Sequence, residues 1–384
     1  MDLVYSPYDR GTNADPFALY ARLRREAPLY HHPELDFWAL SRHADVAAAL
    51  PDSRRFSSDH GPVMDDGVWG PAAHTQLSFV AMDPPAHTRM RAVVSRGFTP
   101  RRIAALEVRV RQIVTAHLDE ALQMGTFDFA ADFSARVPLD VISELMGVPT
   151  ADRARVRREA GAMSGGTPDD VGIQRLLSLR DYYLSVIAER RAEPRDDLLS
   201  VLVGDDGLSD DEIIAFVFLL MGAGSETTTH LLNAAWYRAW QHPGQRAHAF
   251  GGAVAEWAEE SLRYDAPAQG TARRLTEPLD LYGEQVPEGA KMWLLIGSAN
   301  RDETVFPDPD AYDLRRDTSR AIGFGAGRHY CLGGPLARLE ARVAMEELVV
   351  RVDPGYDVDE RGIRRTNHSV VRGMVALPTT VRPR

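Results

Sequence analysis

The chain has 384 residues, of which 44% are hydrophobic, and its 44 Lys and Arg against 55 Asp and Glu give a net charge of -11. This length and composition are those of a globular protein with one large core or two smaller ones. No cationic segment followed by an apolar stretch opens the chain, no apolar run is long enough to span a membrane, and a single cysteine excludes an internal disulfide. We therefore expect a cytoplasmic protein without a membrane anchor, and the acidic balance argues against nucleic acid as its main partner.

Helical periodicity dominates the chain, and no repeat or linker divides it. It predicts helices over residues 16–26, 43–50, 87–96, 102–123, 134–146, 152–163, 171–191 and 209–241. Short strands are predicted at residues 37–40, 291–295 and 371–377. The helix over 209–241 is the longest, and Ser209 and Glu212 form a Ser-x-x-Glu capping box at its start. We expect a single domain over residues 1–384, mainly α-helical with a small β portion.

The only cysteine, Cys331, lies in the most informative segment of the chain, a Phe-x-x-Gly-x-x-x-Cys-x-Gly pattern that runs from Phe324 to Gly333. A thiolate is a soft, strongly donating ligand for iron, and the glycines allow the backbone to pass closely under a flat cofactor. The periodic run that follows Pro335 predicts a helix, and a helix N-terminus favours an anion such as a thiolate. A lone cysteine is more often a small buried hydrophobe, but this spacing favours a ligand.

A second unusual segment, residues 221–228, lies halfway along the longest predicted helix. Gly222 and Gly224 should each destabilise a helix interior by about 1 kcal/mol relative to alanine. The threonines from Thr227 onward carry hydroxyls that can bond back to the preceding turn. Two interpretations remain open, close packing of a neighbouring helix over small residues and a local opening of the helix beside a cofactor.

These segments resemble motifs of the cytochrome P-450 family, which occur here in the family's order from about residue 83 to the C-terminus. The segment around Cys331 resembles the heme-binding loop, so the resemblance implies that Cys331 is the axial ligand of a heme b iron. It likewise places Phe324, His329 and Gly333 at the cofactor.

The segment around Thr227 resembles the family's oxygen-activation motif, Ala-Gly-x-(Glu/Asp)-Thr. The resemblance implies that Ala223 lies against the heme, that Thr227 stabilises bound dioxygen and orders water, and that Glu226 relays protons. It also implies the family's fold, in which the heme lies between the long central helix and the loop and helix that carry the cysteine ligand.

The two heme propionates need cationic or hydrogen-bonding partners if they are buried. The resemblance assigns this role to His87, Arg91 and Arg273 together with His329. His87 and Arg91 are four residues apart and therefore share a helix face.

Glu260 and Arg263 resemble the family's Glu-x-x-Arg pair, which implies a buried structural pair that holds the loop before the cysteine. Family members often place a further Arg or His where this chain has Ala311. Either Arg315 or Arg316 could take that place.

The resemblance implies a heme-thiolate monooxygenase that hydroxylates or epoxidises a hydrophobic small molecule of polyketide, terpenoid, steroid or peptide type, using dioxygen and two electrons. The chain has no phosphate loop and no dinucleotide-binding motif. We therefore expect electrons from a 2Fe-2S or similar ferredoxin with an NAD(P)H-dependent reductase, and a monomeric enzyme. Two alternatives stay open, a peroxide-driven peroxygenase and a non-catalytic heme sensor or ligand carrier.

By resemblance, five segments line the substrate: residues 60–80, 163–168, 216–223, 266–270 and 367–371. The candidate contacts within them are Trp69, Phe79, Phe216, Leu220, Gln269, Asn367 and His368. Most of the lining is apolar or small, so the ligand should be largely apolar, although any one aromatic residue could equally belong to the core. Arginines on the cysteine side predict a basic surface for an acidic electron donor; they are Arg89, Arg96, Arg101, Arg102, Arg328, Arg338 and Arg342.

Overall fold

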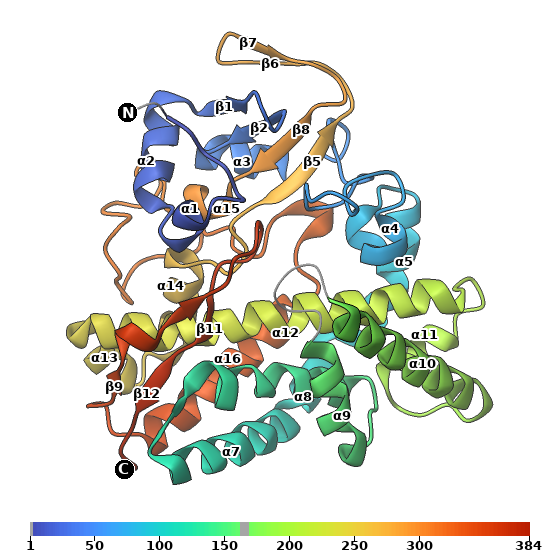
Figure 1. Cartoon of the computed structure of the whole chain (residues 1–384), viewed down its shortest axis with the longest axis vertical. Coiled ribbons are helices and arrows are strands. Elements are labelled where there is room, and N and C mark those ends of the chain that lie inside the picture. Colours follow the sequence, from blue (N-terminus) through green and yellow to red (C-terminus); the bar gives the residue numbers. More distant parts are fainter. Residues whose placement is uncertain (1–2, 162–168) are drawn as a thin grey trace.

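The computed structural model describes residues 3–161 and 169–384. Its organising element is the helix α12 (Asp210–Gln241), whose 32 residues cross the molecule from side to side (Figure 1). Its predicted capping box is complete: the Ser209 hydroxyl accepts a hydrogen bond from the Glu212 N–H at 3.2 Å, and the Glu212 carboxylate accepts one from the Ser209 N–H at 2.9 Å. Three acidic residues in the first turn also favour the helix dipole.

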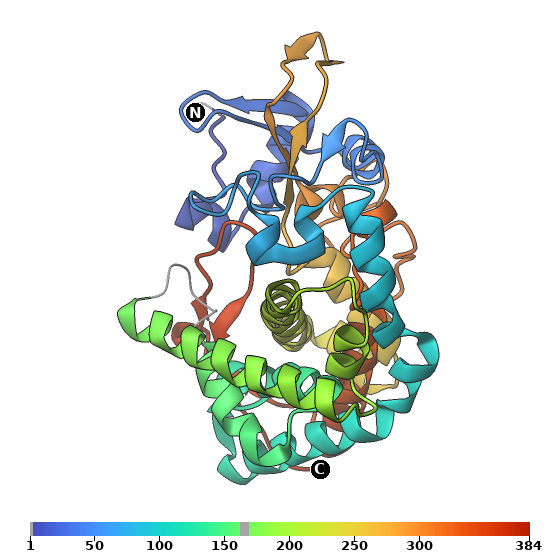
Figure 2. The same ribbon diagram turned by 90° about the vertical axis from the view of Figure 1, so that its right-hand side faces the viewer.

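Helices surround α12, which Figure 2 shows end-on at the centre of the molecule. The longer ones are α7 (Glu107–Met124), α8 (Arg136–Leu145), α9 (Thr150–Ala160), α10 (Asp170–Ala192), α14 (Val254–Tyr264) and α16 (Gly334–Arg351). The shorter ones are α1 (Arg10–Ala14), α2 (Phe17–Glu26), α3 (His43–Ala49), α4 (His74–Leu77), α5 (Ala86–Ser95), α6 (Pro100–Ala105), α11 (Leu198–Val203), α13 (Pro243–Phe250) and α15 (Ile296–Ala299). Both α14 and α16 pack against α12 and against each other.

The main sheet of the β portion lies on the other side of α12 from α7 and α8, whereas β9 (Asp357–Val358) and β12 (Pro378–Thr380) lie on the same side as α7 (Figure 1). The main sheet has the order β1-β2-β8-β5-β3, formed by β1 (Leu29–His32), β2 (Phe37–Leu40), β8 (Lys291–Leu294), β5 (Thr271–Leu275) and β3 (Phe56–Ser57). Only the β2–β8 pairing in this sheet is parallel. Smaller sheets are formed by β4 (Thr126–Asp128), β12 and β9, by β6 (Leu279–Leu281) and β7 (Glu284–Val286), and by β10 (Arg364–Arg365) and β11 (Met374–Ala376).

The predicted mainly α-helical fold with a small β portion is confirmed, and most predicted helices are present. The helix predicted over 102–123 is divided at Leu106 into α6 and α7, and it begins earlier, at Pro100, where the Thr99 side chain caps α6. The strand predicted over 371–377 shrinks to β11, since Val371 forms only an isolated bridge to Ala268. The end of the helix predicted over 152–163 and the substrate-lining turn 163–168 lie outside the described residues, residue 161 being the last before the gap.

Among the described residues, no helix has the length and apolar character that a membrane crossing requires.

Candidate heme and oxygen-activation site

The loop that carries Cys331 turns sharply before α16. Gly325 and Gly327 have φ values of +71° and +69°, a conformation that favours glycine, and the Cys331 N–H donates to the Phe324 carbonyl at 2.9 Å. Because α16 begins at Gly334, the predicted helix N-terminus is present beside the sulfur. Burial raises the pKa of the Cys331 thiol, whereas the N–H groups of Gly333 and Gly334 and the guanidinium of Arg91 lower it. A bound metal would deprotonate the thiol outright.

The structure brings His87, Arg91, Arg273 and His329 together in one cationic cluster. The His87 and His329 rings are 4.3 Å apart between centroids, and Arg91 donates to the Tyr330 carbonyl at 2.7 Å. Arg273 is 4% exposed and reaches only the Thr271 hydroxyl and the Ala272 carbonyl. None of the four residues forms an ion pair with a carboxylate of the described residues.

This cluster has donors but lacks an anion. Both ring nitrogens of His87 and the Nε2 atom of His329 are buried without a hydrogen-bond partner among the described residues. Burial and the repulsion from Arg273, His87 and Arg91 lower the pKa of His329 to about 2, and burial lowers the pKa of Arg273 to about 10. A ligand that brings carboxylates would remove this cost, and the two propionates of heme are such carboxylates. The residues therefore fit heme, with Cys331 for the iron and the cluster for the propionates.

On α12, the oxygen-activation segment keeps its α-helical geometry. The Thr227 hydroxyl bonds back to the Ala223 carbonyl at 2.7 Å, as β-branched hydroxyls in helices can do. A Cβ atom on Gly224 would lie 2.9 Å from Ile142 of α8, so this glycine allows the two helices to approach closely. The structure thus favours close packing at Gly224, and it shows no local opening of the described helix.

His230 is a residue that the sequence analysis missed. It lies one turn after Glu226 on α12, with its Nε2 atom 3.7 Å from the Glu226 carboxylate. The imidazole is 3% exposed, and neither ring nitrogen has a hydrogen-bond partner among the described residues. The i, i+4 spacing from Glu226 was the available signal.

The Glu260–Arg263 pair is buried, with 1% and 0% of the side chains exposed, and forms two hydrogen bonds of 2.7 Å. Arg263 also donates to the carbonyls of Asn300 and Pro309. The third member of this network is Arg316, whose Nε atom lies 3.4 Å from Glu260. Asn300 in turn accepts from the Ile322 N–H at 2.8 Å, which connects the network to the loop of Cys331.

The predicted substrate contacts lie in different settings. Phe79 and Phe216 are buried core residues with ring centroids 6.2 Å apart, Phe79 is 5.9 Å from His87, and Leu220 belongs to the same core cluster. The Gln269 side chain donates to the Ala266 carbonyl at 2.6 Å and so closes its own turn.

The other three candidates lie nearer the surface. Trp69 contacts the ring of His60, with 5.5 Å between centroids. Asn367 is exposed, and the ring of His368 accepts from the N–H groups of Val370 and Val371.

Most of the predicted basic surface is neutralised by neighbouring carboxylates. Arg102 pairs with Asp196, Arg338 with Glu259, and Arg342 with Glu107 and Glu346. Arg89 and Arg96 pair with Glu212 and Asp205. Arg101 and Arg328 are exposed and have no ion pair among the described residues.

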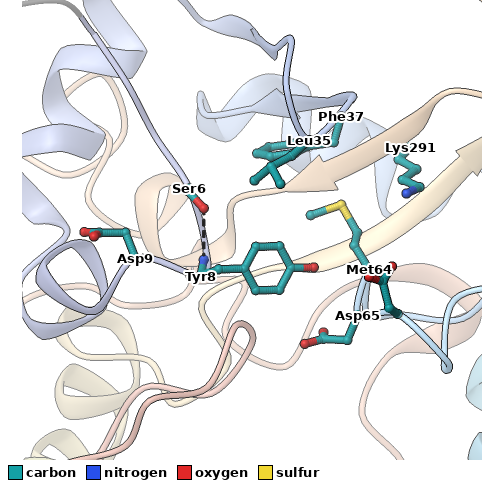
Figure 3. A pocket seen from close by; sticks show the side chains of 9 residues that line it. Ser6, Tyr8, Asp9, Leu35, Phe37, Met64, Asp65 and Lys291 are labelled. Carbon is teal, nitrogen blue, oxygen red and sulfur yellow. Dashed lines mark hydrogen bonds between the residues drawn. The ribbon is translucent and has the colours of Figure 1, made fainter.

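A cavity of about 500 Å³ lies between the N-terminal segment and the β portion. Met64, Asp65 and Asp66 of the predicted substrate segment 60–80 line it, but none of the seven candidate substrate contacts does. The Tyr8 ring extends across it toward Met64 and Asp65 (Figure 3). Asp65 also accepts a hydrogen bond of 2.8 Å from Ser369, so this cavity adjoins the C-terminal turn that the resemblance places at the substrate.

A partly buried cysteine at a helix N-terminus, near a cluster of arginines and histidines without a carboxylate among the described residues, fits a heme-thiolate protein. The sequence model "Cytochrome P450" matches residues 256–371. The chain is 46% identical to "Putative cytochrome P450 123" of Mycobacterium tuberculosis, over all of this chain and 98% of the relative. It is 35% identical to "Vitamin D(3) 25-hydroxylase" of Pseudonocardia autotrophica, over 96% and 94% of the two chains.

The solved structure of CYP109Q5 from Chondromyces apiculatus has a TM-score of 0.90 and 33% identity, over 99% of this chain and 98% of that one. The chain belongs to the cytochrome P450 family. It is an oxidoreductase of the monooxygenase class, and its cofactor is heme b.

Proposed function

We propose that this enzyme inserts one oxygen atom of dioxygen into a hydrophobic small molecule, while the second oxygen atom leaves as water. The reaction consumes two electrons and two protons. The observation that supports it best is the cationic cluster of His87, Arg91, Arg273 and His329 near Cys331, which has donors for two carboxylates and no carboxylate of its own. Heme, when bound, supplies the binding and activation of dioxygen.

In this proposal, α12 delivers the protons. Thr227 holds water at the reacting oxygen, Glu226 passes protons to that water, and His230 passes protons to Glu226 across the 3.7 Å that separates the two groups. The hydroxyl of Thr227 already has an acceptor in the Ala223 carbonyl at 2.7 Å, which leaves its lone pairs directed toward water.

The substrate is a hydrophobic metabolite of polyketide, terpenoid, steroid or peptide type. The relative whose name is a vitamin D(3) hydroxylase supports testing steroid-like molecules first. The buried apolar residues Phe79, Phe216 and Leu220 supply a dry, apolar surface, on which shape rather than hydrogen bonding decides the orientation of a ligand.

The electron donor is a 2Fe-2S or similar ferredoxin, reduced by an NAD(P)H-dependent reductase. Arg101 and Arg328 are the arginines of the predicted surface that keep an unpaired charge among the described residues, so they are the best candidates to attract an acidic donor. Reversal of both charges should slow reduction of the heme by ferredoxin at low salt, whereas charge reversal at the paired Arg102 should slow it less.

The first test is the spectrum of the reduced protein with carbon monoxide, which reports thiolate ligation of the heme. A metabolite library is then titrated for the shift to high-spin heme, and the product of a reconstituted reaction is identified by mass spectrometry. Turnover with ferredoxin exceeding turnover with hydrogen peroxide supports the monooxygenase, and the reverse would establish a peroxygenase.

Thr227→Ala tests the proton route. It should release peroxide in place of product, with product per electron pair reduced about tenfold or more. Ser225→Ala is the matched control, because the Ser225 hydroxyl also bonds back to a carbonyl of α12, that of Met221. Equal coupling in both variants would contradict the role of Thr227.

A further inference from the structure

A second cavity, of about 420 Å³, lies where α2, the C-terminal end of α12 and β10 meet. Its walls include Phe17 of α2, Tyr237 at the end of α12, Tyr264 at the end of α14 and Arg365 of β10. In Figure 1 the ends of α2, α12 and α14 approach one another on the left of the molecule. None of the residues predicted for heme, oxygen or substrate lines this cavity.

Four guanidinium groups meet at the cavity: Arg238, Arg301, Arg365 and Arg372. Three carboxylates accompany them, those of Asp15 and Asp310 in the lining and that of Asp265, which is 5% exposed. Asp265 accepts hydrogen bonds from Arg238 at 2.6 Å and from Arg372 at 2.9 Å. Arg301 pairs with Asp310 at 2.9 Å. A fourth carboxylate, that of Glu360, accepts a hydrogen bond of 2.8 Å from Tyr237 in the lining. The charges are therefore equal in number, but one guanidinium group has no direct partner.

The guanidinium group without a direct partner is that of Arg365. Among the described residues it has no hydrogen bond and no ion pair, and its guanidinium carbon lies 5.9 Å from the ring centroid of Tyr237. Burial and the repulsion from Arg372 and Arg238 lower the pKa of Arg365. A partly buried cation among other cations is costly unless an anion joins it.

A second unused donor belongs to Arg301. This residue is 4% exposed, and its guanidinium carbon lies 3.4 Å from the ring centroid of Phe17 and 3.6 Å from that of Tyr264. One of its terminal nitrogens, NH2, is buried without an acceptor among the described residues. Buried donors in native proteins are nearly always satisfied, and this nitrogen belongs to a residue that lines the cavity, so it is a candidate donor to a ligand.

We propose that this cavity binds a phosphate group. The donors without a partner come from separate elements, Arg365 from β10 and Arg301 from the turn after α15, and Arg372, which already bonds to Asp265, lies beside them. A tetrahedral phosphate can accept from several directions at once, whereas a planar carboxylate offers only two oxygens, and guanidinium groups bind phosphate through paired hydrogen bonds. The phosphate is either free inorganic phosphate or the headgroup of a phosphomonoester, whose organic part the cavity has room to hold.

Hydrogen bonds also connect this site to the edge of the predicted substrate region. Arg372 donates to the carbonyls of Asn13 and Ala14 at 2.6 Å each, and the Asn13 amide donates to the His368 carbonyl at 3.4 Å. A bound phosphate therefore stiffens the corner where the N-terminal segment holds the C-terminal turn.

The test is a titration of the heme-loaded full chain with inorganic phosphate, followed by phosphorus NMR line broadening at constant ionic strength. The wild-type protein should give saturable broadening. Arg365→Gln should raise Kd at least about tenfold, since a charge-assisted hydrogen bond is lost. Arg364→Gln is the matched control, because Arg364 is the exposed neighbour in β10 and does not line the cavity. The control should stay within about twofold of the wild type.

Arg365→Lys keeps the positive charge and should give a Kd between those of the wild type and Arg365→Gln. This second variant shows whether weak binding by Arg365→Gln comes from loss of the charge or from misfolding. A lower Kd for glycerol 3-phosphate than for inorganic phosphate identifies a monoester as the occupant, and equal values identify free phosphate. Broadening that does not saturate in the wild type, or that is the same in Arg365→Gln, would overturn the proposal.

Discussion

Arg273 allows a test that separates a binding role from a structural one. Its guanidinium is buried without a carboxylate partner, and its pKa falls from 12.5 to about 10. This difference corresponds to about 3 kcal/mol of unfavourable free energy at neutral pH in the absence of an anion. Arg273→Gln removes that cost but loses hydrogen bonds to Thr271 and Ala272, each worth about 1 kcal/mol. The heme-free protein should therefore be about as stable as the wild type, or more stable by about 1 kcal/mol.

The heme-loaded protein should respond in the opposite direction. Loss of a charge-assisted hydrogen bond to a propionate costs about 1.5–3 kcal/mol, so heme should dissociate about ten- to a hundredfold faster. Dissociation is measured as heme transfer to excess apomyoglobin, followed by Soret absorbance, and the stability of the heme-free chain by urea unfolding.

The neighbouring Arg274→Gln is the matched control. Arg274 forms a two-bond pair with Asp59, with distances of 3.0 and 2.6 Å, at the partly exposed face of the same strand. The Arg274→Gln substitution should lower the free energy of unfolding by at most about 1 kcal/mol and leave the rate of heme dissociation unchanged. The reasoning would be refuted if Arg273→Gln destabilised the heme-free chain by more than about 1 kcal/mol and left heme dissociation at the wild-type rate.

Three further predictions concern buried ionisable groups. Burial raises the pKa of Asp265, but Arg372, Arg238 and Arg301 lower it further, so that it lies below the usual 3.8. The ionised carboxylate therefore contributes fully to stability above pH 3.8, and this contribution is lost as the pH falls below that value. Below about pH 4, the free energy of unfolding in urea should depend less on pH in Asp265→Asn than in the wild type. Glu260→Ala leaves Arg263 charged and unpaired in the core and should destabilise the protein by about 3–5 kcal/mol, whereas Glu277→Ala, at an exposed pair with Arg54, should cost at most about 1 kcal/mol. His230→Leu should reduce product per electron pair by roughly tenfold while the carbon monoxide spectrum stays unchanged, and full coupling in this variant would remove His230 from the proton route.

Local patterns predicted the parts of the fold that depend on near neighbours. The Ser209–Glu212 capping box identified the start of α12, since both partners lie within one turn of helix. The spacing of glycines around Cys331 predicted a sharp loop followed by a helix, and the structure has both. The division of the helix predicted over 102–123 was missed, because no glycine or proline marks Leu106 and the helical spacing of apolar residues continues across it.

Contacts between distant segments required the tertiary structure. The sequence left Arg315 and Arg316 as alternatives, and only the packing of residues 307–316 against α14 selected Arg316 as the partner of Glu260. The predicted basic surface shows the same limit, since Arg102 is neutralised by Asp196, which is 94 residues away in the chain.

The sequence by itself indicated the family, a candidate cysteine ligand and most of the longer helices, because each depends on residue type at short spacing. The tertiary structure decided which charges find a partner and which do not. Among the described residues it left the cluster around His329 and the guanidinium of Arg365 without a carboxylate, because ion pairing depends on distances between elements that are remote in the chain. These are the groups for which we propose an anion from outside the chain.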